Sequence, residues 1–241
     1  MKRIFDIYFS LIGLVFASPI LLPVMFLVWK QDHHSPFYIA QRVGKGEKLF
    51  NMVKMRSMII GADSSGVDST SANDTRITKV GIFIRRYKLD EVTQLWNVLI
   101  GDMSLVGPRP NVKRETDIYT ETEKRLLTVK PGITDFASIV FSDEGDILQG
   151  KEDPDLAYNQ LIRPWKSRLG LVYIDNSNIF LDVKIMLTTI IAILSRNRAL
   201  KIVTQELKKL NVEQDIVECS TRSNKLIPMP PPGTDHIVSE R

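Results

Sequence analysis

The sequence predicts a mostly helical α+β fold with a small β element, joined to an apolar N-terminal segment. Three observations lead to this prediction. The first thirty residues are overwhelmingly apolar, later stretches repeat apolar residues at helical spacing, and two short apolar runs flank a glycine-containing turn. The length of 241 residues suits one or two domains, and the 44% hydrophobic and 25% charged fractions are ordinary for a globular protein.

The apolar segment covers residues 4–29, where Asp6 is the only charged side chain. It is long enough to cross a bilayer as a helix. A cleaved signal peptide is disfavoured, because the one small-residue pair is followed by Pro19 and by more apolar residues. Pro19 and Pro23 interrupt helical hydrogen bonding, which leaves two alternatives open: a kinked full span, or a re-entrant hairpin with two short arms. Basic residues flank both ends, so charge asymmetry does not enforce a crossing.

The elements that follow are predicted from periodicity and turn residues. Short strands are expected at 37–39 and 49–53, on either side of a Gly-Lys-Gly turn. A helix is expected from residue 90 to about 100, because its apolar residues follow the spacing i, i+3, i+4, i+7 and a glycine comes directly after it. Further helices are expected at 76–87, 112–127, 155–173 and 181–194. Residues 61–74 are rich in Ser, Asp and Gly and are expected to form a mobile loop.

Overall charge and the cysteine count restrict the functional classes. A formal net charge of +4 indicates anionic partners such as nucleic acid, anionic lipid or phosphorylated metabolites, and does not choose among them. Cys219 is the only cysteine, which excludes an intrachain disulfide and a thiolate zinc site. The sequence contains no GxxxxGK[ST] motif, so a Walker-type nucleotide site is not expected.

Asp90 and Glu91 form a carboxylate pair at the start of a predicted helix, directly after a basic stretch that includes Arg85. Taken alone, such a pair is typical of helix capping and of favourable interaction with the helix dipole. The functional alternative is a carboxylate nucleophile or Mg²⁺ ligand with cations nearby to hold phosphate. Arg109 stands between two prolines that restrict its backbone, which suits phosphate binding, and Lys54 ends a strand-like run.

These pieces occur in an order that resembles the monotopic phosphoglycosyl transferases, also called the bacterial sugar transferase family. The matching stretches are KRIFDI at 2–7, Ser18-Pro19, SPFYIAQRVGKGEKLF at 35–50, KMRSM at 54–58, RITKVGIFIRRYKLDEVTQLWNVLIGDMSLVGPRP at 76–110, KPGIT at 130–134 and LDVKIM at 181–186. The resemblance covers roughly residues 2–194, and the block at 76–110 is highly specific.

The resemblance implies a reaction and a topology. A UDP-sugar and polyprenol phosphate would give polyprenol diphosphate-sugar and UMP, with Mg²⁺ as cofactor, at the cytoplasmic face of a bacterial inner membrane. Ser18 and Pro19 would break a re-entrant membrane helix over residues 1–30. Residues 31–210 would form the catalytic domain, with interfacial amphipathic helices that include the one at 181–194, and residues 211–241 a flexible tail.

The resemblance also implies roles for the candidate site residues. Asp90 would attack the sugar-side phosphate and form a covalent phosphosugar intermediate. Glu91 would help to hold Mg²⁺ or manage protons, so both carboxylates are candidate metal ligands. Arg85 and Arg109 would bind phosphate, and Lys54 would lie near them.

The chain departs from the family pattern after residue 132. Residues 132–139 are GITDFASI where the family usually has GITGWAQV, the acidic segment that follows lacks a frequent arginine, and Gly170 replaces an acidic residue. These changes affect the expected sugar pocket. The expected replacement for the missing arginine is Arg163, Lys166 or Arg168.

A second hypothesis is a non-catalytic membrane-anchored module whose basic face binds anionic lipid or nucleic acid. The carboxylate pair argues against it, because paired acids repel phosphate unless a metal is present. Nucleic acid is therefore not an expected partner, whereas membrane lipid is. A scaffold role in envelope-sugar assembly could coexist with catalysis, and a homodimer is compatible with the sequence. The transferred sugar and the glycan pathway are not specified.

Overall fold

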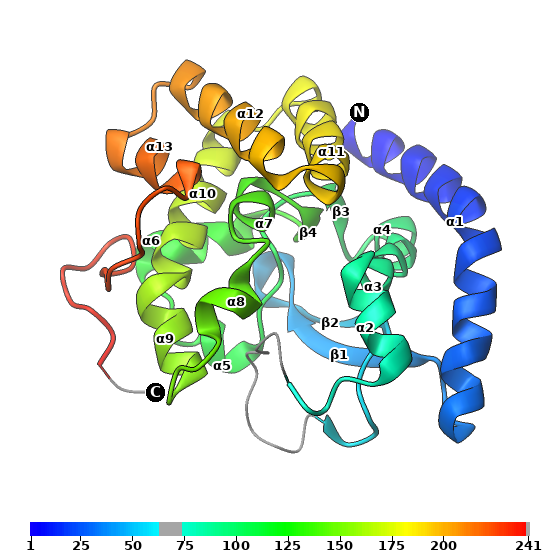
Figure 1. Cartoon of the computed structure of the whole chain (residues 1–241). Coiled ribbons are helices and arrows are strands. Elements are labelled where there is room, and N and C mark those ends of the chain that lie inside the picture. The colour runs from blue at the N-terminus through cyan, green and yellow to red at the C-terminus, as the bar shows by residue number, and fades with distance from the viewer. Residues whose placement is uncertain (63–73, 240–241) are drawn as a thin grey trace.

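The computed structural model describes residues 1–62 and 74–239. The prediction of a mostly helical chain with a small β element is confirmed. The expected mobile loop lies mainly at 63–73, outside the described residues. Figure 1 shows helices gathered around two small sheets, with one long helix along the side of the body.

That long helix, α1, covers Lys2–Asp32 and continues through Pro19 and Pro23. Figure 1 shows that it changes direction along its length. The Ser18 hydroxyl donates a hydrogen bond of 2.8 Å to the Val15 carbonyl. A backbone acceptor in the helical turn before Pro19 is therefore hydrogen-bonded to a side chain. By length and composition α1 could cross a membrane, and only 17% of its most apolar window is buried.

Both ends of α1 are attached to the same globular body. At the start, the Lys2 ammonium lies 2.5 Å from the Asp182 carboxylate. One turn later, the buried Asp6 carboxylate accepts hydrogen bonds of 3.1 Å from Ser104 and Leu105. At the other end, the Arg56 guanidinium makes a two-pronged contact with Asp32, at 2.5 and 2.7 Å.

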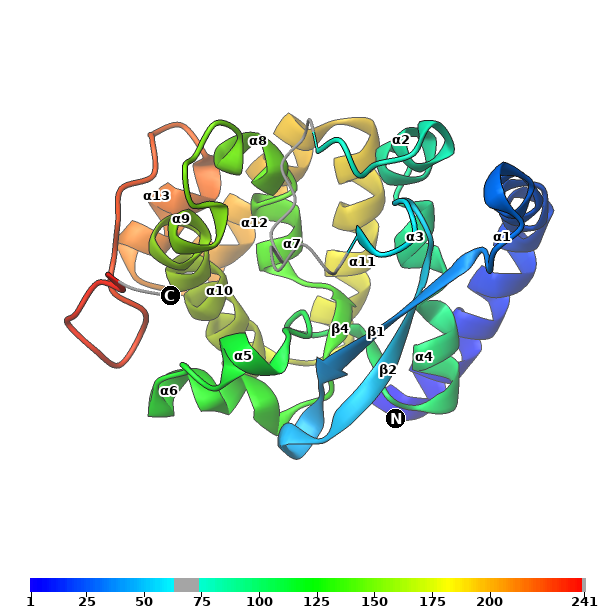
Figure 2. The same ribbon diagram turned by 90° about the horizontal axis from the view of Figure 1, so that it is seen from below.

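The larger sheet is an antiparallel hairpin of β1 (Phe37–Val43) and β2 (Leu49–Met55), joined by the 3-10 turn η1 (Lys45–Glu47). Gly46 has a φ of 64°, which a glycine adopts without strain. Seen from below in Figure 2, the hairpin leaves the end of α1 and crosses the molecule toward α5. The hairpin therefore carries residues from the end of α1 into the centre of the molecule.

The second sheet pairs β3 (Ser104–Val106) with β4 (Gly132–Thr134) in parallel. A Cβ atom on Gly132 would lie 2.1 Å from the Gly107 nitrogen, so only glycine fits at this contact. This pairing holds the loop after β3, which contains Arg109, against residues 132–139, where the sequence departs from the family pattern.

Three short helices come next among the described residues: α2 (Lys79–Arg86), α3 (Leu89–Val92) and α4 (Leu95–Ile100). The predicted helix at 90–100 is therefore divided in two, and Gly101 ends it as expected, with a φ of 103°. The Asn97 amide bonds the Val53 nitrogen and the Asn51 carbonyl, each at 2.8 Å, and so fixes α4 on β2.

The remaining helices form the other half of the molecule. They are α5 (Lys113–Thr116), α6 (Glu121–Lys124), η3 (Arg125–Thr128), α7 (Phe136–Val140), α8 (Glu144–Leu148), α9 (Pro154–Leu161), α10 (Arg163–Asn176), α11 (Ile179–Leu194), α12 (Arg196–Lys209) and α13 (Gln214–Thr221). A large part of the core lies where α7 contacts α10 and α12, with Phe136, Ile139 and Leu169 almost fully buried.

The segment after residue 210 contains a helix, α13, that periodicity did not predict. Ile216 and Val217 are buried there. Beyond it, the Met229 nitrogen donates to the Gln160 carbonyl at 3.0 Å and Arg168 donates to the Pro230 carbonyl at 3.0 Å. The described part of this segment thus lies against α9 and α10.

Candidate active site

Asp90 and Glu91 lie in the first turn of α3, directly above β2. The Thr93 hydroxyl contacts the carbonyls of both Asp90 and Val53, at 2.9 and 3.2 Å. This contact fixes the start of α3 over the end of β2, where Lys54 lies. The residue before α3, Lys88, adopts a left-handed conformation with a φ of 56°, which turns the chain sharply between α2 and α3.

All five predicted site residues line one cavity of about 790 Å³: Lys54, Arg85, Asp90, Glu91 and Arg109. They come from β2, α2, α3 and the loop after β3. Ser18 and Pro19 lie elsewhere, inside α1. A volume of this size is within the range of small-molecule binding sites.

Glu91 is held by two cations. The Arg109 guanidinium lies 3.3 Å from its carboxylate and the Lys88 ammonium 3.9 Å. Arg109 also donates a 2.8 Å hydrogen bond to the Ile133 carbonyl, which fixes its orientation. Burial favours the neutral acid, but Arg109, Lys88 and Lys54 outweigh it, so the pKa of Glu91 is lower than its ordinary value.

Asp90 has the opposite electrostatic situation. Burial, and then the charge of Glu91, raise the pKa of Asp90 above its ordinary value, against the pull of Lys54. Among the residues that the structure describes, the buried Oδ1 atom of Asp90 has no hydrogen-bond partner. An unpaired carboxylate oxygen inside a cavity is energetically costly, and such atoms occur where a substrate or ion completes the site.

Two further cations face this carboxylate. Burial, and then the proximity of Arg109, lower the pKa of Lys54 to about 8. The Arg85 Nε donates to the Ser57 hydroxyl at 3.0 Å, which orients the guanidinium. The site therefore combines two carboxylates with four cations, Lys54, Arg85, Lys88 and Arg109, as expected for a site that binds a diphosphate.

The cavity continues into the segment where the chain departs from the family pattern. Of the three basic candidates for the missing arginine, Lys166 lines the cavity and pairs with Glu144. Arg163 is instead buried against Glu123, at 2.5 Å, and Arg168 donates to backbone carbonyls. Lys166 and Glu144 are 22 residues apart in the sequence, so no local pattern predicts that they form an ion pair.

Packing explains why position 170 is a glycine and not the acidic residue that is usual in the family. A Cβ atom there would lie 2.8 Å from a Leu126 methyl and 3.7 Å from Pro108, so a larger side chain would displace its neighbours. Other cavity residues that the sequence did not single out are Arg42, Asn111, Thr134, Ser138 and Glu115.

Comparisons with known proteins identify the family of this chain. A model of the family described as "Bacterial sugar transferase" matches residues 1–196. The chain belongs to the bacterial sugar transferase family.

Three relatives in this family are similar over much of the chain. A Bacillus subtilis protein, provisionally named an undecaprenyl-phosphate N-acetylgalactosaminyl 1-phosphate transferase, is 45% identical over 56% of this chain and 71% of its own length. The undecaprenyl-phosphate galactose phosphotransferase of Salmonella typhimurium is 34% identical over 83% of this chain and 41% of its own length. An Aeromonas hydrophila protein, named UDP-N-acetylgalactosamine-undecaprenyl-phosphate N-acetylgalactosaminephosphotransferase, is 32% identical over 81% of this chain and 44% of its own length. This sugar transferase chain thus spans less than half of the Salmonella and Aeromonas relatives.

Proposed function

We propose that this sugar transferase moves a sugar-1-phosphate from a UDP-sugar to a polyprenol phosphate, such as undecaprenyl phosphate, and releases UMP. The names of the Salmonella and Aeromonas relatives support the donor and acceptor classes. The observation that carries the proposal is the buried Asp90 oxygen, which has no hydrogen-bond partner within residues 1–62 and 74–239. It lies in the lining of a cavity that Lys54, Arg85 and Arg109 also line. The reaction would be the first membrane step of a bacterial glycoconjugate pathway.

The chemistry follows from the two carboxylates. An Asp90 oxygen attacks the sugar-side phosphorus of the donor, the bond to the bridging oxygen breaks, and UMP leaves with that oxygen. The phosphosugar is then bound to Asp90 as an acyl phosphate. Arg85, Arg109 and Lys54 neutralise the charge that spreads over the phosphoryl oxygens. An oxygen of the polyprenol phosphate attacks the same phosphorus, forms the diphosphate and frees the Asp90 carboxylate.

The residues present fit a Mg²⁺ ion. Among residues 1–62 and 74–239, no group of three or more His, Cys, Asp or Glu side chains is placed to bind a metal alone. Mg²⁺ commonly uses one or two carboxylates together with substrate phosphates and water. Asp90 and Glu91 would hold it, and it would supply charge neutralisation on the diphosphate.

We also propose that α1 is re-entrant at the cytoplasmic face of the inner membrane. A helix of this length measures about 46 Å at 1.5 Å per residue. Its two ends nevertheless contact the same body, through Lys2–Asp182 and Asp32–Arg56. One body cannot lie on both faces of a bilayer, so these two ion pairs support a helix that enters and leaves by one face, with the bend near Ser18 and Pro19.

Exposed apolar side chains support an interfacial position for α4 and α11. Trp96 and Ile100 on α4 are about half exposed, whereas the polar Gln94 and Asn97 beside them are buried. On α11 the exposed apolar residues are Phe180, Val183, Leu187, Ile190, Ile193 and Leu194. Helices with such faces lie in the headgroup region of a membrane. The site would then stand at the depth of the acceptor phosphate.

The test measures UMP release by the full chain in detergent or nanodiscs, with a panel of UDP-sugars, undecaprenyl phosphate and Mg²⁺. We expect release that needs all three components, and a loss of at least about a thousandfold in Asp90→Asn, because the nucleophile is removed. Asp215→Asn, an exposed acid on α13, should retain wild-type activity.

Full activity in Asp90→Asn, with deamidation excluded by mass spectrometry, would refute the nucleophile assignment. Binding of anionic vesicles without UMP release from any donor would favour the membrane-anchored binding module. The donor that supports turnover identifies the sugar.

A further inference from the structure

A second, smaller cavity of about 380 Å³ meets the first one at the catalytic carboxylate. Four residues line both cavities: Arg42, Lys54, Arg85 and Asp90. Asp90 is therefore accessible from two directions. A nucleophile that reacts with a donor and then with an acceptor can use two approaches when the two molecules differ in chemistry.

The linings of the two cavities differ in their acids and neutral polar groups. Among the described residues, Asp90 is the only carboxylate that lines the smaller cavity, where Lys54, Arg56 and Arg85 provide positive charge. The larger cavity adds Glu91, Glu115 and Glu144 and further cations such as Arg109, together with hydroxyl and amide groups suited to a sugar and a nucleoside. The smaller cavity thus favours a compact anion more strongly than a polyhydroxylated ligand.

The smaller cavity also has an apolar wall. The apolar residues in its lining are Phe37, Ile39, Met55, Met58, Ile59 and Ile60. Three of them are exposed to a degree unusual for isoleucine: Ile39 by 60%, Ile59 by 53% and Ile60 by 56%. Aliphatic side chains held open beside a cluster of cations match an amphiphile with an anionic head and a hydrocarbon chain.

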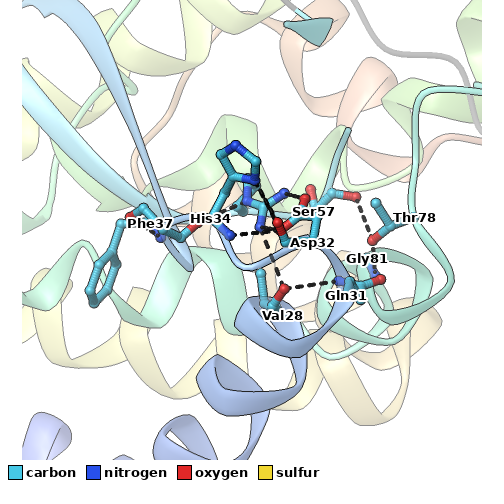
Figure 3. Close-up of polar contacts among 10 residues, drawn as sticks. Val28, Gln31, Asp32, His34, Phe37, Ser57, Thr78 and Gly81 are labelled. Carbon is cyan, nitrogen blue, oxygen red and sulfur yellow. Dashed lines mark hydrogen bonds and ion pairs between the residues drawn. The ribbon is translucent and has the colours of Figure 1, made fainter. Parts of the chain in front are cut away.

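The position of this wall connects it to the membrane helix. Figure 3 shows the junction at the end of α1, where Asp32 and His34 come together and Phe37 extends away from the polar contacts. Arg56, which lines the smaller cavity, bonds Asp32 at 2.5 Å and the Ser35 carbonyl at 2.8 Å. On α1 itself, Phe26 and Trp29 are exposed near the same end. Apolar surface therefore continues from α1 toward Asp90.

We infer that the smaller cavity is the acceptor subsite, which binds the phosphate and the first isoprene units of a polyprenyl phosphate. The inference rests on the proposed function. The phosphate lies at Lys54 and Arg85, and the hydrocarbon chain passes Ile59, Ile60 and Ile39 on its way to the membrane. An acceptor oxygen then attacks the phosphorus bound to Asp90, and the Asp90 carboxylate leaves. The donor, the larger and more polar molecule, occupies the 790 Å³ cavity.

The test uses the full chain in nanodiscs and compares the KM values for the two substrates. The double variant Ile59→Ser/Ile60→Ser should raise the KM for undecaprenyl phosphate about tenfold, because apolar contact with the isoprene units is lost. The KM for the UDP-sugar should stay within about twofold of the wild type, which also shows that the variant is folded.

The matched control is Ile118→Ser/Ile227→Ser, in which the two isoleucines are similarly exposed and line neither cavity. It should change neither KM value. An unchanged acceptor KM in Ile59→Ser/Ile60→Ser, or a rise in the KM for the UDP-sugar instead, would overturn the acceptor assignment. Wild-type protein that releases no UMP would overturn the proposed function, and the acceptor subsite with it.

Discussion

Ser57 connects the backbone at the end of β2 to a cation of the site. Its side chain is buried and accepts the 3.0 Å hydrogen bond from Arg85, while its carbonyl accepts a 3.0 Å bond from the Thr78 nitrogen at the start of α2. Gly81 packs so closely that a Cβ atom there would lie 1.9 Å from the Ser57 carbonyl oxygen. Figure 3 shows Ser57, Thr78 and Gly81 beside the end of α1. We therefore regard Ser57 as a positioning residue for Arg85.

We expect Ser57→Ala to lower kcat/KM for the UDP-sugar about tenfold, because the Arg85 guanidinium loses the hydrogen bond that orients it. Ser57→Thr keeps the hydroxyl and should restore most of the activity. Steady-state kinetics on the three proteins test this. Equal loss in both variants would indicate a packing effect and contradict the positioning role.

Single residues differ in how far the sequence could predict them. Asp90, Glu91 and Arg109 could be named because they stand in a highly specific stretch, and the structure brings them into one cavity. Ser57 and Lys166 could not, because a serine or a lysine has no distinctive pattern and their contacts depend on tertiary approach. The catalytic and metal-binding roles themselves stay predictions.

At the scale of elements, the helix at 90–100 has an unexpected orientation. Its apolar spacing predicted a helix correctly, and in a water-soluble protein that face would be buried. In the structure the polar Gln94 and Asn97 are buried and Trp96 is half exposed. The proposed lipid interface gives the physical reason, because apolar side chains there need no protein core. Periodicity alone cannot distinguish a core face from a lipid face.

This orientation predicts a contrast between neighbouring residues. Asn97→Ala leaves the Val53 nitrogen and the Asn51 carbonyl without their partner and should destabilise the fold by about 2 kcal/mol, or roughly 4–8 °C in Tm. Trp96→Ala should leave Tm almost unchanged and weaken binding to lipid vesicles. Thermal melts in detergent and vesicle flotation measure the two effects. The reverse pattern would contradict the proposed orientation.

At the scale of the whole molecule, the two ends of α1 share one body. The length and composition of the apolar segment were evident in the sequence, but its topology was not, because two prolines suit both a kinked span and a hairpin. The contacts that support the proposed re-entrant topology join residues far apart along the chain, such as Lys2 with Asp182. Local patterns carry no information about such pairs.

A labelling experiment tests the topology. In a Cys219→Ser background, single cysteines are placed ahead of Met1, at Gln31 and at Asp215. A membrane-impermeant maleimide should modify all three from the cytoplasmic side of sealed vesicles, since no polar segment crosses the bilayer. Labelling of the first site from the opposite side would establish a full span.

The attachment of the start of α1 also has a consequence for biosynthesis. The partner of Lys2 is made 180 residues later, and the partners of Asp6 are made 98 and 99 residues later. Because a chain leaves the ribosome from its N-terminus, α1 is made before these groups exist. In the proposed topology, α1 would therefore enter the lipid first, and the body would assemble on it. A nascent chain that stops before α11 leaves the Lys2 ammonium without its carboxylate partner.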